Sequence, residues 1–310
     1  MLTSFFGKSS PINYILLSIA IVMGYFMGVL IAQEATLSID SLLDHLATIF
    51  LMVFAVLLLD FILRKNNVTK NNTYSILLFV LFVLMIPQVY LDMPLVLANV
   101  FILLATRRIL SLNTEKNTEK KIFDATMYIT LASFCYGWAI LFFLVLYPSI
   151  IRKTSVAIRF LIIPIIGFIG FSILAISYQL VIKESFAWIY NWFPKISFDF
   201  SAYNAMTLLI PITLLCTLLI WMGGTRLTGL SSLSKKEKPA AITVLLIATI
   251  SILMVLASPL KTGGELVFLL APVAIIVANY IESGTAKERF IFNEIVLWCL
   301  IVLVFLIPFI

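Results

Sequence analysis

The stretch at residues 125–148, ATMYITLASFCYGWAILFFLVLYP, decides how this chain folds. It is long and apolar enough to form one tilted helix through a hydrocarbon layer about 30 Å thick. It also carries Tyr136-Gly137-Trp138 at its middle, where a chain can turn back. If the chain turns there, residues 123–151 form a short helical hairpin. If it does not, every later segment lies in the opposite orientation.

The positions of the basic residues decide between these two alternatives, because Lys and Arg collect in the cytoplasmic loops of membrane proteins. With a hairpin, 18 of the 21 Lys and Arg residues lie on the side of the N-terminus, and only Lys183, Lys195 and Lys261 lie on the other. With a single helix the division is 12 against 9. We therefore predict the hairpin, with the N-terminus in the cytoplasm and the C-terminus outside.

The composition indicates a membrane protein along the whole chain. Hydrophobic residues make up 62% and charged residues 12%, and the mean hydropathy is +1.13, whereas soluble domains carry about 25% charged residues. Backbone polar groups in lipid must bond within the chain, so the apolar runs are expected to be helical. These runs lie at about 12–32, 46–63, 73–90, 94–106, 123–135, 139–151, 160–182, 204–222, 240–258, 265–281 and 290–310. We predict one domain over 1–310, an all-α transmembrane bundle of about eleven segments.

The residues that the chain lacks exclude several cofactors. His45 is its one histidine, so a haem between two histidines, a four-histidine iron site and an H-E-x-x-H zinc site cannot form. Cys135, Cys216 and Cys299 lie far apart in apolar runs and predict neither a metal site nor a disulfide. The net charge of +6 sits in short loops, where the positive-inside rule explains it without a nucleic-acid partner.

The side predicted to face outward carries most of the candidates for chemistry. They are Glu34, Asp40, Asp44 and His45 after the first segment, Asp92 in the second outward loop, and Lys261 and Glu265 before the tenth segment. A carboxylate there can act as a general base or hold a divalent metal ion against a phosphate, and a lysine can bind that phosphate. We therefore predict Glu34, Asp40 and Glu265 as catalytic and the other four as ligand-binding. Acidic residues are also ordinary in outward loops, so a purely solvating role stays open.

Two further features have mainly structural interpretations. The outward loop at 183–203 is rich in Trp, Tyr and Phe, and we expect it to lie along the lipid head groups as an anchor or as a lid over a lipid-linked substrate. Asp60 lies one turn before Arg64 and is predicted to pair with it. Asp124 and Glu294 stand near segment starts, where a carboxylate complements a helix N-terminus.

Two stretches carry a resemblance over the whole chain. The opening MLTSFFGKSSPINY at 1–14 and GGELVFLLAPVAIIVANYIES at 263–283 resemble a family of uncharacterised bacterial inner-membrane proteins. Members of that family are sometimes labelled β-carotene monooxygenase. The resemblance implies a multi-pass protein of the bacterial inner membrane without a known activity. The carotenoid label conflicts with the single histidine, because that iron site needs four.

The order of features is also similar to the GT-C class of glycosyltransferases that use polyprenyl-phosphate sugars, and to O-antigen polymerases. In those proteins an acidic outward loop follows the first helix, and Glu34, Asp40 and Asp44 match it in position. A short hairpin and a charged residue before a late L-x-x-P helix also match, the latter as Glu265 before LVFLLAP. The sequence departs from the class because its first outward loop has no adjacent acidic pair and no large outward domain follows.

Three functional hypotheses follow. The first is a GT-C-like protein that handles a lipid-linked glycan at the outer face of the membrane, with a divalent metal ion compatible with the outward carboxylates. The second is a non-catalytic subunit or scaffold of a cell-envelope assembly, which has other membrane proteins as partners. The third is a transporter or flippase, which the lack of charges at the centres of the segments disfavours.

Overall fold

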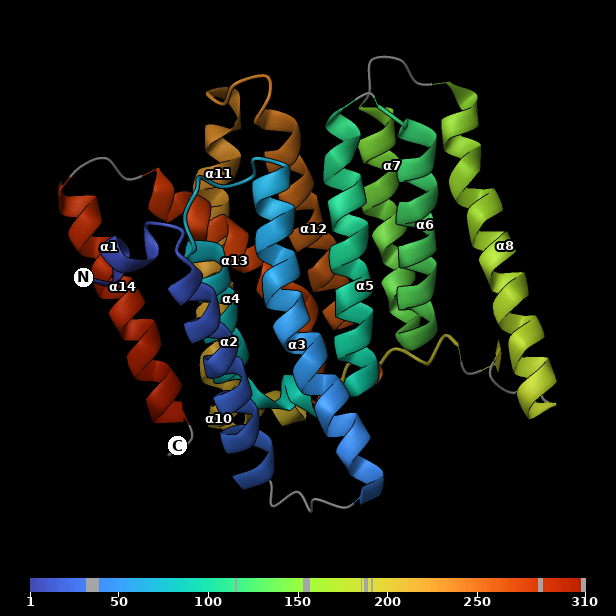
Figure 1. Ribbon diagram of the computed structural model, residues 1–310, viewed down its shortest axis with the longest axis horizontal. Coiled ribbons are helices and arrows are strands. Elements are labelled where there is room, and N and C mark those ends of the chain that lie inside the picture. The colour runs from blue at the N-terminus through green and yellow to red at the C-terminus, as the bar shows by residue number, and fades with distance from the viewer. Residues whose placement is uncertain are drawn as a thin grey trace.

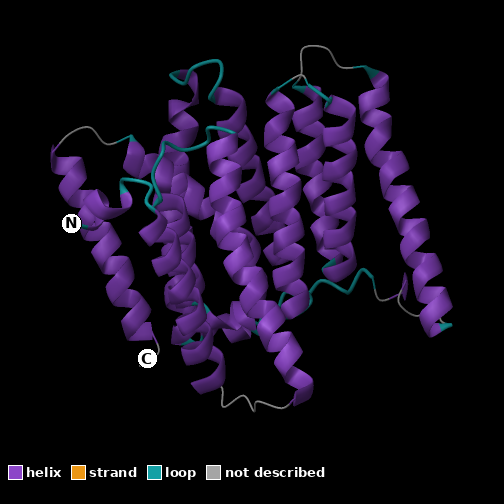
Figure 2. Ribbon diagram, viewed as in Figure 1, coloured by secondary structure: helices purple, strands orange, loops and turns teal. Residues whose placement is uncertain are grey.

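The chain is described from a computed structural model that covers residues 1–31, 39–114, 116–152, 157–184, 186, 189–190, 192–283 and 287–307. The side chains of 30–31, 39–41, 183 and 287–290 are outside this description. Figures 1 and 2 show a bundle of long helices joined by short connections, and no strand occurs among the residues covered. The expected all-α fold is therefore confirmed.

The helices correspond to the eleven expected segments. They are α2 (Pro11–Tyr25) with the π-helix Phe26–Ile31, α3 (Ile39–Lys65), α4 (Tyr74–Met85), α5 (Met93–Leu110), α6 (Thr118–Cys135), the 3-10 helix Gly137–Phe142 with α7 (Phe143–Ile151), α8 (Ile158–Lys183), α10 (Met206–Leu218) with the π-helix Leu219–Gly223 and α11 (Gly224–Thr228), α12 (Lys238–Leu256), α13 (Val267–Glu282) and α14 (Lys287–Leu306). A short helix, α1 (Leu2–Phe6), precedes them. Within the described residues, seven helices are long and apolar enough to cross a membrane, and three apolar helices are shorter.

The predicted hairpin is present. The helix α6 ends at Cys135, and Tyr136 has extended dihedral angles that turn the chain into the 3-10 helix. Arg159 at the start of α8 forms an ion pair of 3.2 Å with Glu119 at the start of α6. This contact requires α6 and α8 to begin at the same end of the bundle, so the chain between them crosses and returns.

The bundle consequently has a basic end, defined by the connections α3–α4, α5–α6, α7–α8 and α11–α12, at the top of Figure 1. The connections α4–α5, α8–α10 and α12–α13 leave the opposite end. Lys183, Lys195 and Lys261 belong to the opposite end, as the hairpin requires. The separation of charge favours a cytoplasmic basic end by the positive-inside rule, and the orientation in a membrane stays a prediction.

The centre of the bundle is formed by α4 and α13. Both helices consist mainly of apolar residues, most of which are buried. In the most apolar window of the Gly264–Glu282 span, 89% of the residues are buried. In the corresponding window of Ile158–Ile182 the share is 17%. Helix α8 packs mainly against α6 and forms one edge of the bundle.

Charged residues near helix ends pair within the chain. Asp60 and Arg64 lie 2.7 Å apart, which confirms the predicted pair. Asp124 pairs with Arg108 at 2.9 Å instead of capping its own helix. The carboxylate of Glu294 accepts hydrogen bonds from the backbone N–H groups of Leu2 at 2.6 Å and Thr3 at 2.9 Å, so it fixes α1 against α14.

The hairpin makes a prediction about topology. In a chain whose three native cysteines are replaced by alanine, Thr114→Cys and Ser234→Cys should lie on one side of the membrane and Lys195→Cys on the other. A membrane-impermeant maleimide should label Lys195→Cys in intact cells, and should label the other two only after permeabilisation. Opposite labelling of Thr114→Cys and Ser234→Cys would mean that residues 123–151 cross as a single helix.

The turn of the hairpin predicts a matched pair of glycine variants. A Cβ atom on Gly137 would lie 2.0 Å from the backbone oxygen of Trp192, whereas one on Gly170 would meet nothing within 4 Å. Gly137→Ala should lower the free energy of unfolding by about 1–3 kcal/mol through overpacking, measured by SDS titration. Gly170→Ala should leave that energy unchanged or raise it slightly. Equal stability of the two variants would contradict the close approach at Gly137.

Candidate functional site

The connection between α12 and α13, residues 257–266, holds two of the predicted site residues and is mostly buried. Lys261 is 4% exposed and Glu265 is 0% exposed. Loops usually run over a protein surface, because buried loop backbone must find hydrogen-bond partners. We therefore expect the polar side chains of this connection to form hydrogen bonds with its own backbone.

Lys261 donates hydrogen bonds to the carbonyl groups at the end of α12. Its Nζ donates to the carbonyl oxygens of Val255 at 2.9 Å, Leu256 at 2.8 Å and Ser258 at 2.9 Å. The last carbonyl groups of a helix have no partner within the helix, and a lysine near the C-terminus complements them. The ring of Phe200 lies 5.2 Å from the same Nζ. All three ammonium protons are thus used, so a phosphate would have to displace a carbonyl oxygen to bind there.

Burial lowers the pKa of the Lys261 ammonium, and the nearby negative charge of Glu265 acts in the opposite direction. The two side chains lie four residues apart and form no ion pair within 4 Å in the described structure. Lys261 turns back to α12, and Glu265 turns toward the next part of the connection.

Glu265 fastens the connection to a remote segment. Its Oε2 accepts a hydrogen bond from the backbone N–H of Gly263 at 3.0 Å, and its Oε1 accepts one from the phenol of Tyr203. Burial raises the pKa of Tyr203, and the hydrogen bond and charge of Glu265 raise it further. Both carboxylate oxygens are therefore occupied, which leaves Glu265 poorly placed to accept a proton from a substrate.

Glycine makes this turn possible. Gly263 has a φ of 94°, in the left-handed region that side chains with a Cβ rarely adopt. A Cβ on Gly263 would also lie 2.7 Å from a methyl group of Leu208. Gly264 packs against the backbone oxygen of Gln88, in the 3-10 helix Pro87–Tyr90. The α12–α13 connection is thus held against the α4–α5 connection.

Asp92, in the α4–α5 connection, and His45, near the start of α3, lie at the same end of the bundle as Glu265. Asp92 is exposed and caps α5, because its carboxylate accepts from the N–H of Leu95 at 3.2 Å. His45 Nδ1 bonds to the phenol of Tyr25, whose ring lies 5.4 Å from that of Tyr90. These residues have local bonding roles within the described structure.

The remaining predicted residues do not reach this cluster as far as the structure describes them. Asp44 is exposed on α3, and its carbonyl oxygen accepts from Thr48. Glu34 lies outside the described residues, and so does the side chain of Asp40. Among the residues that are described, no group of three His, Cys, Asp or Glu side chains could hold a metal ion.

Tyr203, which bonds to Glu265, and Tyr136, which bonds to α12, were not predicted as site residues from the sequence. Tyr136 at the hairpin turn donates to the carbonyl oxygen of Met254 at 2.6 Å, so it satisfies another part of α12. Tyr136 lies in an apolar stretch and Tyr203 at the end of the aromatic segment, and a buried phenol usually finds a hydrogen-bond partner. That signal could have marked both residues as bonded, although it could not have named their partners.

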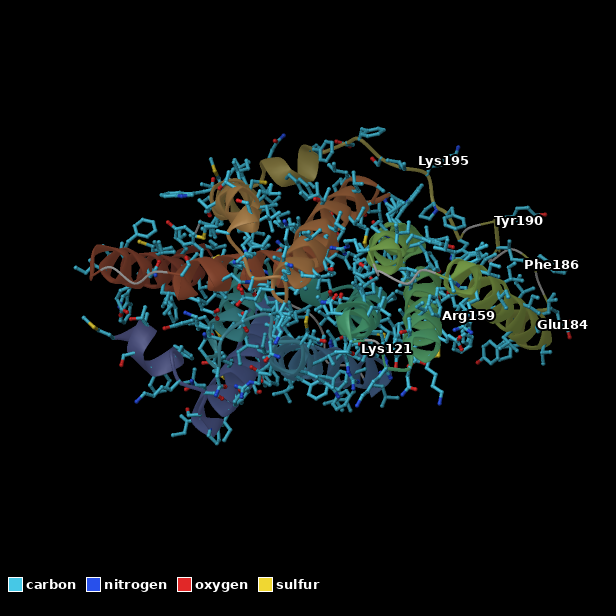
Figure 3. All side chains as sticks on the ribbon, turned by 90° about the horizontal axis from the view of Figure 1, so that it is seen from above. Lys121, Arg159, Glu184, Phe186, Tyr190 and Lys195 are labelled. Carbon is cyan, nitrogen blue, oxygen red and sulfur yellow. The ribbon has the colours of Figure 1, made fainter. Side chains whose placement is uncertain are left out.

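The aromatic segment has a packed part and an exposed part. Trp192 Nε1 donates to the carbonyl oxygen of Ser133 at 2.7 Å, and its ring packs against that of Phe134. Tyr190 is 85% exposed and Phe198 is 77% exposed. Figure 3 shows Glu184, Phe186, Tyr190 and Lys195 along the outside of the bundle. This arrangement favours the anchor interpretation, with Trp192 as the fixed point under the hairpin.

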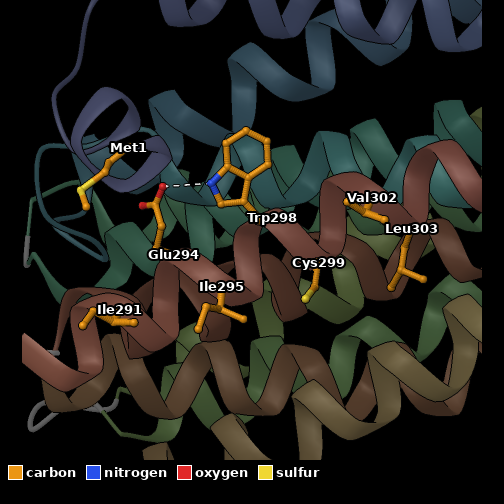
Figure 4. A pocket seen from close by; sticks show the side chains of 8 residues that line it. All are labelled: Met1, Ile291, Glu294, Ile295, Trp298, Cys299, Val302 and Leu303. Carbon is orange, nitrogen blue, oxygen red and sulfur yellow. Dashed lines mark hydrogen bonds between the residues drawn. The ribbon is translucent and has the colours of Figure 1, made fainter.

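The larger cavities lie away from this cluster. A groove of about 610 Å³ runs along α14, with Glu294 and Trp298 among its lining residues (Figure 4). Trp298 Nε1 donates to Glu294 at 3.2 Å, as the dashed line in the figure marks. A second cavity, of about 300 Å³, lies at the basic end. Neither is lined by Lys261 or Glu265.

The bonded state of the two buried ions predicts a loss of stability on substitution. Lys261→Met leaves three carbonyl oxygens without a donor and removes the positive charge near the buried Glu265 carboxylate, so it should lower the free energy of unfolding by about 3 kcal/mol. Lys195→Met, in the exposed part of the aromatic segment, is the control and should change that energy by less than about 0.5 kcal/mol. SDS titration followed by tryptophan fluorescence measures both, and equal stability would contradict the bonding described.

Comparison with known proteins places the chain in a family but near no characterised protein. No curated protein and no solved structure matches it. A family model described as a family of unknown function, DUF6427, matches residues 8–310. The match covers nearly the whole chain and includes the late stretch at 263–283. The expected bacterial inner-membrane family stays a prediction. The resemblance to glycosyltransferases stays a prediction. The chain belongs to the DUF6427 family of unknown function.

Proposed function

We propose that the chain is a non-catalytic subunit of a bacterial cell-envelope assembly, and that it packs through α8 against another protein of the inner membrane. The observation that carries the proposal is the edge position of α8, which spans the bundle while most of its surface faces away from the chain. A helix of this kind is surrounded by lipid or by a partner helix.

The composition of the exposed face of α8 favours a partner helix. Gly170 lies on it with open space around the position of a Cβ atom, and Ser177 and Tyr178 are also exposed. Glycine costs about 1 kcal/mol relative to alanine within a helix, and no described residue approaches Gly170 closely enough to require it. Small residues at the surfaces of transmembrane helices let two backbones approach each other.

The bonding of Lys261 and Glu265 supports a non-catalytic role. Catalytic carboxylates must reach a substrate, and a general base must be within hydrogen-bond distance of the proton that it takes. Glu265 is wholly buried and bonded to Tyr203 and Gly263. The glycosyl-transfer hypothesis therefore depends on Glu34 and Asp40, whose side chains the structure does not describe.

Substitution of Gly170 tests the proposal without disturbing the chain itself. Gly170→Leu fills open space, so the amount of folded chain should match the wild type. The complex extracted in a mild detergent should shrink to the size of the single chain, measured by size-exclusion chromatography with light scattering. Ile220→Leu is the control and should leave the complex intact. Ile220 is 76% exposed on the π-helix Leu219–Gly223.

A photo-crosslinking amino acid at position 170 should also give one adduct of defined mass, and the same group at position 220 should give none. A wild-type chain that is monomeric in mild detergent and forms no adduct at position 170 would contradict the proposal. In that case Asp40→Asn, assayed for envelope glycan and for membrane abundance, separates the glycosyl-transfer hypothesis from the others.

A further inference from the structure

A cavity of about 300 Å³ at the basic end has features of a ligand site. It lies between the α3–α4 connection, the start of α12 and the end of α13, and its charged lining residues are Lys70, Arg226, Glu237 and Glu282. Its volume is at the lower limit of small-molecule sites, roughly 300–1,000 Å³. None of these residues takes part in the cluster around Glu265.

Two of the four charged residues, Lys70 and Glu282, are joined by hydrogen bonds that connect the α3–α4 connection to the end of α13. The carboxylate of Glu282 accepts from the backbone N–H of Lys70 at 2.9 Å and from Asn72 Nδ2 at 2.6 Å. Lys70 Nζ donates to the carbonyl oxygen of Glu282 at 3.0 Å. These bonds fix the wall of the cavity and leave the charge of Arg226 as its main unsatisfied feature.

Arg226 lines the cavity and forms no hydrogen bond or ion pair within 4 Å among the described residues, although it is half-buried. It stands on α11, directly after the π-helix Leu219–Gly223. Such π-helical turns are frequent at functional sites. A guanidinium partly removed from water is costly without a partner, and its planar donors match a phosphate in two parallel bonds.

The carboxylates of the cavity select among phosphates. Glu237 and Glu282 both lie close enough to Arg226 to act on its charge. Glu237 is exposed, and its Oε2 accepts from Ser234 at 2.9 Å. A ligand that carries only negative charge is attracted by Arg226 and repelled by these carboxylates. A phosphate ester that also carries a primary amine can bind both signs of charge.

The position of Arg226 near one end of its membrane-spanning segment indicates that the phosphate ester is a lipid head group. It lies near the end of Met206–Ser231, a span long and apolar enough to cross a membrane, so the guanidinium is placed at the boundary where lipid phosphates lie. We infer that the cavity binds the head group of an ethanolamine phospholipid, with the phosphate on Arg226 and the ammonium toward Glu237.

Lipid titration of the delipidated full-length chain, followed by native mass spectrometry, tests this inference. The wild type should bind phosphatidylethanolamine more tightly than phosphatidylglycerol with the same acyl chains. Arg226→Gln should weaken phosphatidylethanolamine binding by about tenfold or more, because it removes a charge-assisted contact. Glu237→Gln, at an exposed position, should abolish the preference between the two lipids. Lys235→Gln, exposed and outside the cavity lining, is the control and should change neither affinity.

Arg226→Lys keeps the charge but loses the two parallel bonds, so its affinity should fall between those of the wild type and Arg226→Gln. It also provides a test if Arg226→Gln fails the check of a monodisperse elution profile. Unchanged binding by either variant, or equal wild-type affinity for the two lipids, would overturn the inference. Competition by soluble O-phosphoethanolamine at the affinity of the lipid would assign the site to a free ester and overturn the lipid assignment.

Discussion

The burial of the α12–α13 connection is the constraint on which the opposite end of the bundle depends. A buried connection must satisfy its own backbone polar groups, and here one lysine and one glutamate do most of this. Lys261 occupies the carbonyl oxygens at the end of α12, and Glu265 holds Gly263 and Tyr203. Each ion is costly to bury alone, and the opposite charge nearby offsets part of that cost. The central helix α13 can therefore begin deep inside the bundle, where it packs against α4 and α12.

The same bonds connect parts of the chain that are far apart in the sequence. Through Tyr203, Glu265 fixes the end of the long aromatic segment, whose Trp192 packs beneath the hairpin turn. Through Tyr136, the turn itself bonds to α12. The described connections at the opposite end are therefore held together by internal bonds, whereas the basic end has a cavity with an arginine that has no described partner. This contrast favours a ligand site at the basic end and a structural role for Lys261 and Glu265 at the opposite end.

Much of the fold could be predicted from the sequence, because a lipid environment restricts it. Eleven apolar runs became eleven helical segments, and the distribution of Lys and Arg identified the hairpin that periodicity left open. The pair Asp60–Arg64 was predictable since its residues are one helical turn apart. The directions of Lys261 and Glu265 were not predictable, because their partners come from α12 and from Tyr203, 62 residues away. An acidic residue beside an apolar helix gives the same sequence pattern whether it faces a cavity or a buried phenol.

Hydrogen exchange of residues 257–266 in lipid nanodiscs tests the central claim most directly. The claim is that Glu265 and Lys261 close this connection from within. It predicts slow exchange of the Gly263 amide in the wild type, faster exchange in Glu265→Gln, and fast exchange in both proteins of the exposed residues 234–236 between α11 and α12, which serve as the internal reference. Exchange at Gly263 as fast as in that reference would show that the connection is open to water, and would return Glu265 to the candidates for catalysis.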